Sequence, residues 1–184
     1  MNVLAISGSL RTQASNTAIL EAACRLAPPS IHVTLYPGVG ALPYFNPDLD
    51  REDGAGLPTE VARLREQVGD ADALLISTPE YAHGLPGAFK NALDWLVGST
   101  SFPGKAVAVI NVSPRSVHAH AQLREILTTM SARLLDDASL TIPLPRRDID
   151  AQAIAQDDEL AALVRSVLDA IALAVASNRC VTSE

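Results

Sequence analysis

Near the start of the chain, residues 5–20 read AISGSLRTQASNTAIL, an apolar run followed by a polar turn and a helical pattern. The apolar run, Val3 to Ile6, predicts a short buried strand that stops at a Ser-Gly-Ser sequence. Residues 16–26 then place apolar side chains at helical spacing. The turn between strand and helix collects hydroxyl groups and one arginine, Arg11. Such a composition at the first strand-to-helix turn raises the question of what the turn binds.

The rest of the chain repeats this alternation of strand and helix. Five strands alternating with helices predict an α/β fold with a parallel sheet and helices on both faces. The common doubly wound order for five strands is 2-1-3-4-5, and its ligand crevice lies beyond the carboxyl ends of strands 1 and 3. We expect the remaining strands over residues 31–36, 73–77, 105–112 and 139–144, and the remaining helices over residues 59–68, 86–97, 117–135 and 155–176.

Length, charge and cysteine usage narrow the class of protein. The 184 residues, 48% of them hydrophobic, predict one globular domain over 1–178 and a disordered tail over 179–184. A formal net charge of −7 without a basic cluster argues against a nucleic-acid or anionic-membrane partner. Cys24 and Cys180 lie far apart and show no metal-ligand spacing, which is typical of free thiols in a reducing compartment. With no signal-type segment and no membrane-spanning run visible, we expect a cytoplasmic protein without a metal site.

The first loop has the composition of an anion site. A helix that starts near Asn16 offers unpaired backbone N–H groups and a partial positive charge. Serine and threonine hydroxyls can donate to phosphate oxygens, and Arg11 adds a charged, bidentate donor. The alternative is that Ser15 or Asn16 only caps the helix. Neither a Walker loop nor a GxGxxG fingerprint is present, so the phosphate of a mononucleotide fits better than a dinucleotide.

The loop after the third strand is the second unusual stretch. Residues 78–95 read TPEYAHGLPGAFKNALDW. The flat, amphipathic Tyr81 is suited to lie along a ring system, and Gly84 and Gly87 permit a close approach of the backbone. The alternative is a plain turn that leads into a helix beginning with proline. Because both loops follow strands at the switch point of one sheet, we expect them to form one site.

These two loops resemble the signatures of the NAD(P)H-dependent FMN reductase family, which includes flavodoxin-like quinone, chromate and azo reductases. Residues 8–16, GSLRTQASN, are similar to the phosphate loop of that family, and residues 79–95 are similar to its second signature. The resemblance implies a flavodoxin-like fold and bound FMN. It places the phosphate on Ser9, Arg11, Ser15, Asn16 and Thr17, and the isoalloxazine against Pro79, Glu80, Tyr81, Ala82, His83 and Gly84.

The loop after the fourth strand departs from the family pattern. The family has a serine followed by a glycine-rich loop beside the flavin, whereas residues 112–118 read VSPRSVH. Ser113 matches the serine, and Ser113 and Arg115 are the candidate flavin-binding residues here. Arg115 and His118 could also contact a phosphate of an incoming nicotinamide cofactor. In a third interpretation neither binds a ligand: Arg115 is solvated, and His118 lies on an ordinary helix surface. We assign His120 to the helix surface.

The resemblance also implies a function. It implies an FMN-dependent NAD(P)H oxidoreductase that passes hydride from a nicotinamide cofactor to a small acceptor: a quinone, an azo compound, a metal oxyanion or free flavin. Because the flavin carries the chemistry, we expect no catalytic side chain. Two alternatives stay open: a flavodoxin-type electron carrier without NAD(P)H activity, and a flavin-free interaction module on the same fold.

The resemblance also implies that the helix over residues 86–97 packs against the same helix of a second copy. We therefore expect a homodimer, with a tetramer as the alternative. Lys90, Asn91 and Asp94 would then be interface or structural groups. The long loop over residues 37–56 either borders the substrate space or only covers the surface.

Overall fold

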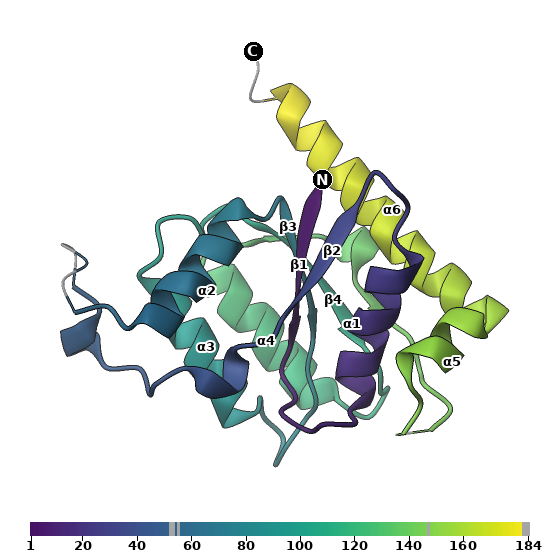
Figure 1. The fold of residues 1–184 in the computed structure, drawn as a ribbon, viewed down its shortest axis with the longest axis horizontal. Coiled ribbons are helices and arrows are strands. Elements are labelled where there is room, and N and C mark those ends of the chain that lie inside the picture. The colour runs from purple at the N-terminus through teal and green to yellow at the C-terminus, as the bar shows by residue number, and fades with distance from the viewer. Residues whose placement is uncertain (52–53, 55, 147, 182–184) are drawn as a thin grey trace.

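The computed structural model describes residues 1–51, 54, 56–146 and 148–181. Within them a parallel sheet crosses the middle of the molecule (Figure 1). The strand order β2-β1-β3-β4-β5 confirms the expected doubly wound topology, and β6 also pairs in parallel with β4. The strands are β1 (Asn2–Ser7), β2 (His32–Tyr36), β3 (Ala73–Ser77), β4 (Ala106–Asn111), β5 (Arg133–Leu134) and β6 (Leu140–Thr141).

Helices cover both faces of the sheet. Figure 1 shows α1, α5 and α6 on one side of the sheet and α2, α3 and α4 on the other, which is the three-layer α/β/α arrangement. In the part of the chain that the structure describes, short 3-10 turns also occur at η1 (Val39–Ala41), η2 (Pro47–Leu49) and η3 (Asp136–Ala138). The helices are α1 (Ser15–Leu26), α2 (Thr59–Asp70), α3 (Gly87–Val97), α4 (Val117–Thr129), α5 (Ala151–Gln156) and α6 (Asp158–Val181).

The sheet separates two hydrophobic cores. Successive side chains of a strand point to opposite faces, so the apolar residues of β1 divide between the two cores. Val3 and Ala5 pack with α1 and α6, whereas Leu4 and Ile6 pack with α2, α3 and α4. Because both faces are covered, the central strands are continuous apolar runs, which explains why their positions could be predicted closely.

The structure corrects the sequence expectation after β4. The helix expected over 117–135 ends earlier, because Ser131 adopts a φ of 62° and the N–H of Ala132 donates to the Leu127 carbonyl at 2.9 Å. This left-handed residue stops the helix and turns the chain into β5. The single strand expected over 139–144 is only the two-residue β6. The end of the expected helix instead forms β5, and the sheet has six strands within the described residues.

The C-terminal helix also differs from the expectation of one helix over 155–176. It consists of two helices, because Asp157 has an extended backbone and its Oδ1 accepts the Leu160 N–H at 3.0 Å, which starts a new helix. The first helix, α5, begins earlier than expected, because the Asp150 Oδ1 accepts the Ala153 N–H at 2.7 Å. The second helix, α6, continues through residue 181, so the first three residues of the expected tail are helical. Residues 182–184 of that tail lie outside the described residues.

One segment of α6, Asp158–Asn178, is long and apolar enough to cross a membrane by length and composition alone, contrary to the expectation from the sequence. Its apolar side chains at Leu160, Val164, Leu168 and Ile171 are buried against the sheet. A core helix of a globular domain passes the same test, so this segment is weak evidence for a membrane span.

Candidate functional site

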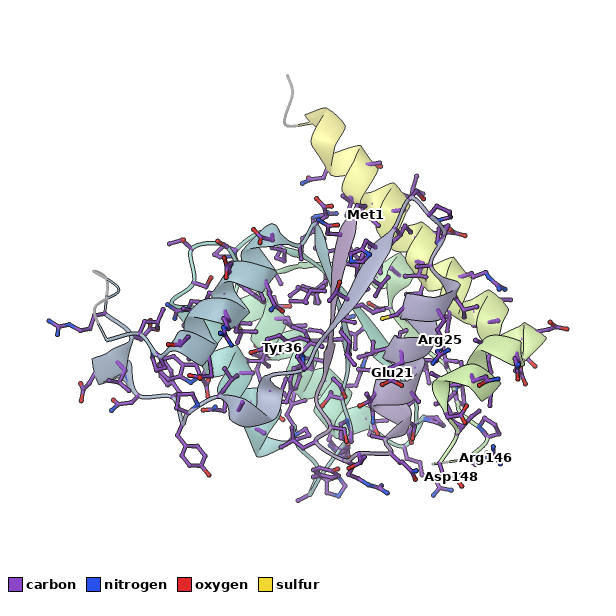
Figure 2. The ribbon with its side chains drawn as sticks, in the orientation of Figure 1. Met1, Glu21, Arg25, Tyr36, Arg146 and Asp148 are labelled. Carbon is purple, nitrogen blue, oxygen red and sulfur yellow. The ribbon has the colours of Figure 1, made fainter. Side chains whose placement is uncertain are left out.

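A cavity of about 640 Å³ lies beyond the carboxyl ends of β1, β3 and β4, where the strand order reverses. This is the position at which doubly wound sheets bind ligands. Figure 2 shows Arg146, one of the lining residues, at the end of the molecule opposite Met1, which precedes β1. The cavity is lined by Ser9, Arg11, Ala14, Ser15, Asn16, Pro79, Glu80, Tyr81, Val112, Ser113, Pro114, Arg115, Ser116, Pro143, Leu144, Pro145 and Arg146.

Most residues singled out in the sequence meet in this cavity. The lining includes nine of them, from three different loops: Ser9, Arg11, Ser15, Asn16, Pro79, Glu80, Tyr81, Ser113 and Arg115. Four others, Thr17, Ala82, His83 and Gly84, do not line it. The Thr17 hydroxyl instead lies 2.8 Å from the Ser7 hydroxyl, where it supports the loop from behind.

The start of α1 has the features of an anion site. Its N-cap residue is Ala14, which offers no side-chain cap, so neither Ser15 nor Asn16 occupies the capping position. The first-turn N–H groups of a helix have no acceptor within the helix, and the helix dipole favours a negative charge there. The Asn16 Oδ1 accepts the Ser77 hydroxyl at 2.9 Å, which fixes the helix start against β3.

Gly8 brings the first loop into direct contact with the second. Its N–H donates to the Ser77 carbonyl at 2.9 Å. A Cβ at this position would lie 2.1 Å from the Thr78 Oγ1 and 2.6 Å from the Thr78 Cβ. Only glycine fits this approach, so the two loops are positioned relative to each other by backbone contact.

The loop after β3 forms a tight two-residue turn at the cavity wall. Tyr81 and Gly84 exchange two backbone hydrogen bonds of 3.0 Å, with Ala82 at a φ of 50° and His83 at a φ of 60°. Two consecutive left-handed residues are typical of a type I′ hairpin turn, which asparagine and glycine usually occupy. Non-glycine residues in this region store backbone strain, and such strain often occurs at binding sites. The turn leaves Tyr81 51% exposed beside the cavity.

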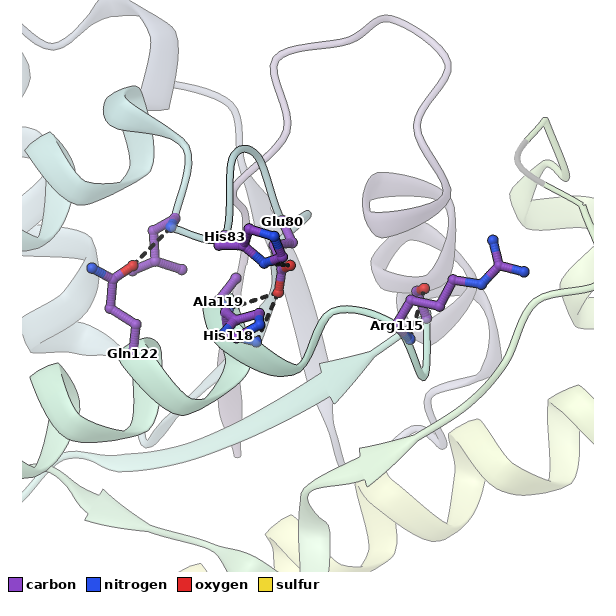
Figure 3. A network of polar contacts seen from close by, with 8 residues as sticks. Glu80, His83, Arg115, His118, Ala119 and Gln122 are labelled. Atoms are coloured by element: carbon purple, nitrogen blue, oxygen red, sulfur yellow. Dashed lines mark hydrogen bonds and ion pairs between the residues drawn. The ribbon is translucent and has the colours of Figure 1, made fainter.

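Glu80 connects the second loop to the third. Its Oε2 accepts the N–H groups of His118 at 2.8 Å and Ala119 at 2.9 Å, at the start of α4 (Figure 3). The hydrogen bond from Ala119, helped by that of His118, lowers the pKa of Glu80 below its ordinary value. The Glu80 Oε1 lies 3.3 Å from the His83 Nδ1, and the His83 and His118 rings pack edge to face with centroids 4.3 Å apart. Glu80 is therefore a carboxylate whose charge is balanced by a helix N-terminus.

The third loop is a compact turn without the glycines of the family pattern. The Asn111 Oδ1 accepts the Ser113 N–H at 3.1 Å, and the Ser113 Oγ accepts the Arg115 N–H at 3.3 Å. The Ser116 N–H closes the turn on the Ser113 carbonyl at 3.0 Å. Figure 3 shows the Arg115 side chain extending away from Glu80. His120 is half-buried rather than fully on the helix surface, and this burial lowers its pKa.

The second half of the long motif has a structural role. The Asn91 amide donates to the Pro43 carbonyl at 2.9 Å and accepts the Phe45 N–H at 2.7 Å. The fully buried Trp95 donates its Nε1–H to the same carbonyl at 2.8 Å and packs edge-on against Phe45. Lys90 forms an ion pair with the carboxylate one turn later in α3. The described part of the loop over 37–56 is thus attached to α3 and contributes no residue to the cavity lining.

A fourth loop was missed from the sequence. Residues 143–146, Pro-Leu-Pro-Arg, also line the cavity and contribute a third arginine. The rule that carboxyl ends of parallel strands share one edge could have identified this loop, because it follows the last strand. Ala14, Val112, Pro114 and Ser116 were also missed, and each lies next to a residue that was singled out.

Together, the strand order and the phosphate-suited loop at its switch point define a flavodoxin-like, mononucleotide-binding α/β protein. A family model described as NADPH-dependent FMN reductase matches residues 1–146, and the chain belongs to this family. The protein is therefore an NAD(P)H-dependent, FMN-using oxidoreductase of the FMN reductase and quinone reductase type.

Known proteins resemble this chain over most of its length. The NAD(P)H-dependent FMN reductase of Pseudomonas aeruginosa is 34% identical over 178 residues, which are 94% of each chain. The quinone reductase of Escherichia coli is 32% identical over 158 residues, which are 83% of this chain and 82% of the relative. Among solved structures, the flavoenzyme NAD(P)H:(acceptor) oxidoreductase of Paracoccus denitrificans has a TM-score of 0.70 and 30% identity, covering 92% of this chain and 96% of that one.

The residues of the cavity fit FMN. At one side, the uncapped start of α1, the Ser9 and Ser15 hydroxyls and the Arg11 guanidinium supply donors for a phosphate. The Pro79, Tyr81, Val112 and Leu144 side chains supply apolar surface for a flat ring system.

Proposed function

We propose that this protein binds FMN in the cavity and transfers electrons from NAD(P)H to a quinone. The convergence of the uncapped α1 start with the Tyr81 turn in one cavity supports FMN binding at this place. The quinone is favoured among small acceptors because the relatives named above include a quinone reductase.

The first loop is proposed to bind the phosphate. Ser9, Arg11, Ser15 and Asn16 line the cavity beside the start of α1, whereas Thr17 would act through its contact with Ser7. A phosphate dianion at this position would be stabilised by backbone N–H groups, by hydroxyl donors and by one guanidinium. An acidic chain can therefore bind this anion without an overall positive field.

The second and third loops are proposed to bind the ring. Pro79 and Tyr81 provide an apolar wall, and the backbone of Ala82, His83 and Gly84 makes the turn that positions Tyr81. Ser113, on the third loop, faces the same cavity. Because Glu80 is engaged by the N-terminus of α4, its charge repels an anionic cofactor less than a free carboxylate would.

When bound, FMN supplies the hydride and electron chemistry, so no acid or base of the protein is required. The side chains bind the cofactor, orient it and exclude water from its buried edge. Their loops leave the solvent side of the cavity open to NAD(P)H and then to the acceptor.

The test begins with the visible spectrum of the purified protein after equilibration with FMN, followed by anaerobic titration with NADPH and NADH. We expect flavin absorbance that bleaches with at least one nucleotide. Arg11→Ala should weaken FMN binding about tenfold, the loss of one charged hydrogen bond. Arg25→Ala, at the other end of α1 (Figure 2), is the matched control and should bind FMN as the wild type does.

The same titration separates the alternatives. A flavodoxin-type electron carrier would hold FMN but would not consume NAD(P)H, and an interaction module would show no flavin absorbance. Either result would contradict the proposed function. Arg11→Ala with unchanged FMN affinity would contradict only the role given to that residue.

We further infer a homodimer through α3 in the cytoplasm, with a tetramer as the alternative. Val97 on α3 is 65% exposed, and Tyr44, on the loop attached to α3 by Asn91 and Trp95, is 93% exposed. Where exposed apolar side chains form a contiguous patch, they often mark an interface. Val97→Glu should shift the mass measured by light scattering toward the monomer, and an unchanged mass would argue against this face. The free, half-buried Cys24 supports a reducing compartment.

A further inference from the structure

Three arginines line one cavity of a chain whose formal net charge is −7. They come from three different loops, Arg11 after β1, Arg115 after β4 and Arg146 after β6. Within the described part of the chain, no hydrogen bond or ion pair of the Arg115 side chain is found. Arg146 has a long contact of 3.8 Å with Asp148, and both side chains are more than 60% exposed, at 63% and 76%. Such an exposed pair neutralises little charge.

One FMN phosphate does not need all three guanidiniums. The phosphate region already combines Arg11 with hydroxyl groups and the start of α1. Arg115 and Arg146 belong to the third and fourth loops, which follow β4 and β6, neighbouring strands of the sheet. The positive charges of these two arginines are little neutralised by the protein, which indicates that a second negative group binds in the cavity beside FMN.

Local hydrogen bonds hold the backbone that carries Arg115. The Ser113 Oγ accepts the Arg115 N–H, and Asn111 in turn fixes Ser113. The guanidinium itself extends away from the cluster of Glu80 and His83 (Figure 3). A charged side chain on a fixed turn can contribute to recognition with little loss of backbone entropy.

We propose that Arg115 and Arg146 form a second anion subsite, which binds the 2′-phosphate of an incoming NADPH. This inference rests on the proposed function. Guanidiniums bind phosphate oxygens in a bidentate manner, and NADPH carries one more phosphate than NADH. A quinone lacking charge would not use the subsite, so the same cavity can accept it after the dinucleotide leaves. The enzyme should accordingly prefer NADPH to NADH.

The test compares FMN-loaded wild type with Arg115→Ala, Arg146→Ala, the double variant and Arg115→Lys. Arg63→Ala, an exposed arginine of α2 outside the cavity lining, is the matched control. Steady-state kinetics with NADPH and with NADH use a neutral quinone as acceptor. Calorimetric titration with NADP⁺ measures binding without turnover, and fluorescence titration measures the FMN affinity of each variant.

We expect each alanine variant to raise the KM for NADPH and the Kd for NADP⁺ about tenfold, with a smaller effect on NADH. The KM for NADPH should rise with salt in the wild type and depend less on salt in the double variant. Arg115→Lys should recover part of the loss, and Arg63→Ala should match the wild type.

Other outcomes overturn the proposal. A double variant within about twofold of wild type in the NADPH KM and NADP⁺ Kd would show that the two arginines do not bind the dinucleotide. A tenfold loss of FMN affinity would assign them to the cofactor, and a loss confined to a negatively charged quinone would assign the anion to the acceptor. If wild type oxidises neither dinucleotide, the proposed function itself fails. Equal kinetics of wild type and variants would refute only the second anion subsite.

Discussion

Replacing Gly8 by alanine tests whether the first two loops form one unit. In the structure a Cβ at this position would lie 2.6 Å from the Thr78 Cβ, whereas carbon atoms in contact prefer about 3.5–4.0 Å. The clash with the Thr78 Cβ cannot be removed by a rotamer change, so the first loop must move by roughly 1 Å. Overpacking of this kind costs about 2 kcal/mol of stability.

The displacement should also weaken FMN binding, because the donors that follow Gly8 in the first loop move with it. Losing one charged hydrogen bond to the phosphate corresponds to a Kd about tenfold higher. Urea unfolding of the apoprotein should show a midpoint lower by about 1 M, for a slope of about 2 kcal/mol/M. Flavin fluorescence measures the Kd.

Two further variants make the test specific. At Gly87, the first residue of α3, an added Cβ meets no heavy atom within 4 Å, so Gly87→Ala should leave both measurements near wild type. Thr78→Gly combined with Gly8→Ala should restore part of the lost affinity, because it removes the atoms that clash. If Gly8→Ala has the stability and the FMN affinity of wild type, the reasoning about loop contact is refuted.

Three more predictions follow from other contacts. Asn91→Ala leaves the Phe45 N–H without its acceptor and should lower the free energy of unfolding by about 2 kcal/mol; an unchanged urea midpoint would contradict this. Because folding lowers the pKa of Glu80, its carboxylate stabilises the folded protein fully above an ordinary carboxyl pKa, and this stabilisation is lost as pH falls. The difference in urea midpoint between wild type and Glu80→Gln should therefore narrow from about pH 7 to about pH 4, and a constant difference would argue against this role. Ala82→Gly relieves a left-handed alanine and should raise stability by roughly 1 kcal/mol, whereas a loss of stability would show that the turn is not strained.

The sheet order and most elements could be predicted from the sequence because their signals are local. Continuous apolar runs identify central strands, and helical spacing identifies the helices between them. The region after β4 could not be predicted as well, because β5 and β6 have only two residues each. Their pairing with β4 is decided by tertiary contact, and the end of α4 depends on a left-handed Ser131 that no propensity indicates.

The candidate site shows the same division. Residues within the two long motifs were assigned to the cavity, and most of them line it. Glu80 lines the cavity as expected, and its side chain also accepts the N–H groups of a helix about forty residues later in the chain, which the motif does not indicate. Arg146 was missed because no motif marks its loop, although the loop follows the last expected strand. A sequence motif thus identifies the lining more readily than the partner that each side chain finds.

The most direct test of the central claim compares the affinities of the protein for FMN and for riboflavin, which differ only in the phosphate. Fluorescence titration of the apoprotein measures both dissociation constants. If the start of α1, Arg11 and the hydroxyl groups bind the phosphate, FMN should bind about a hundredfold more tightly than riboflavin. Equal affinities for the two flavins would contradict the claim.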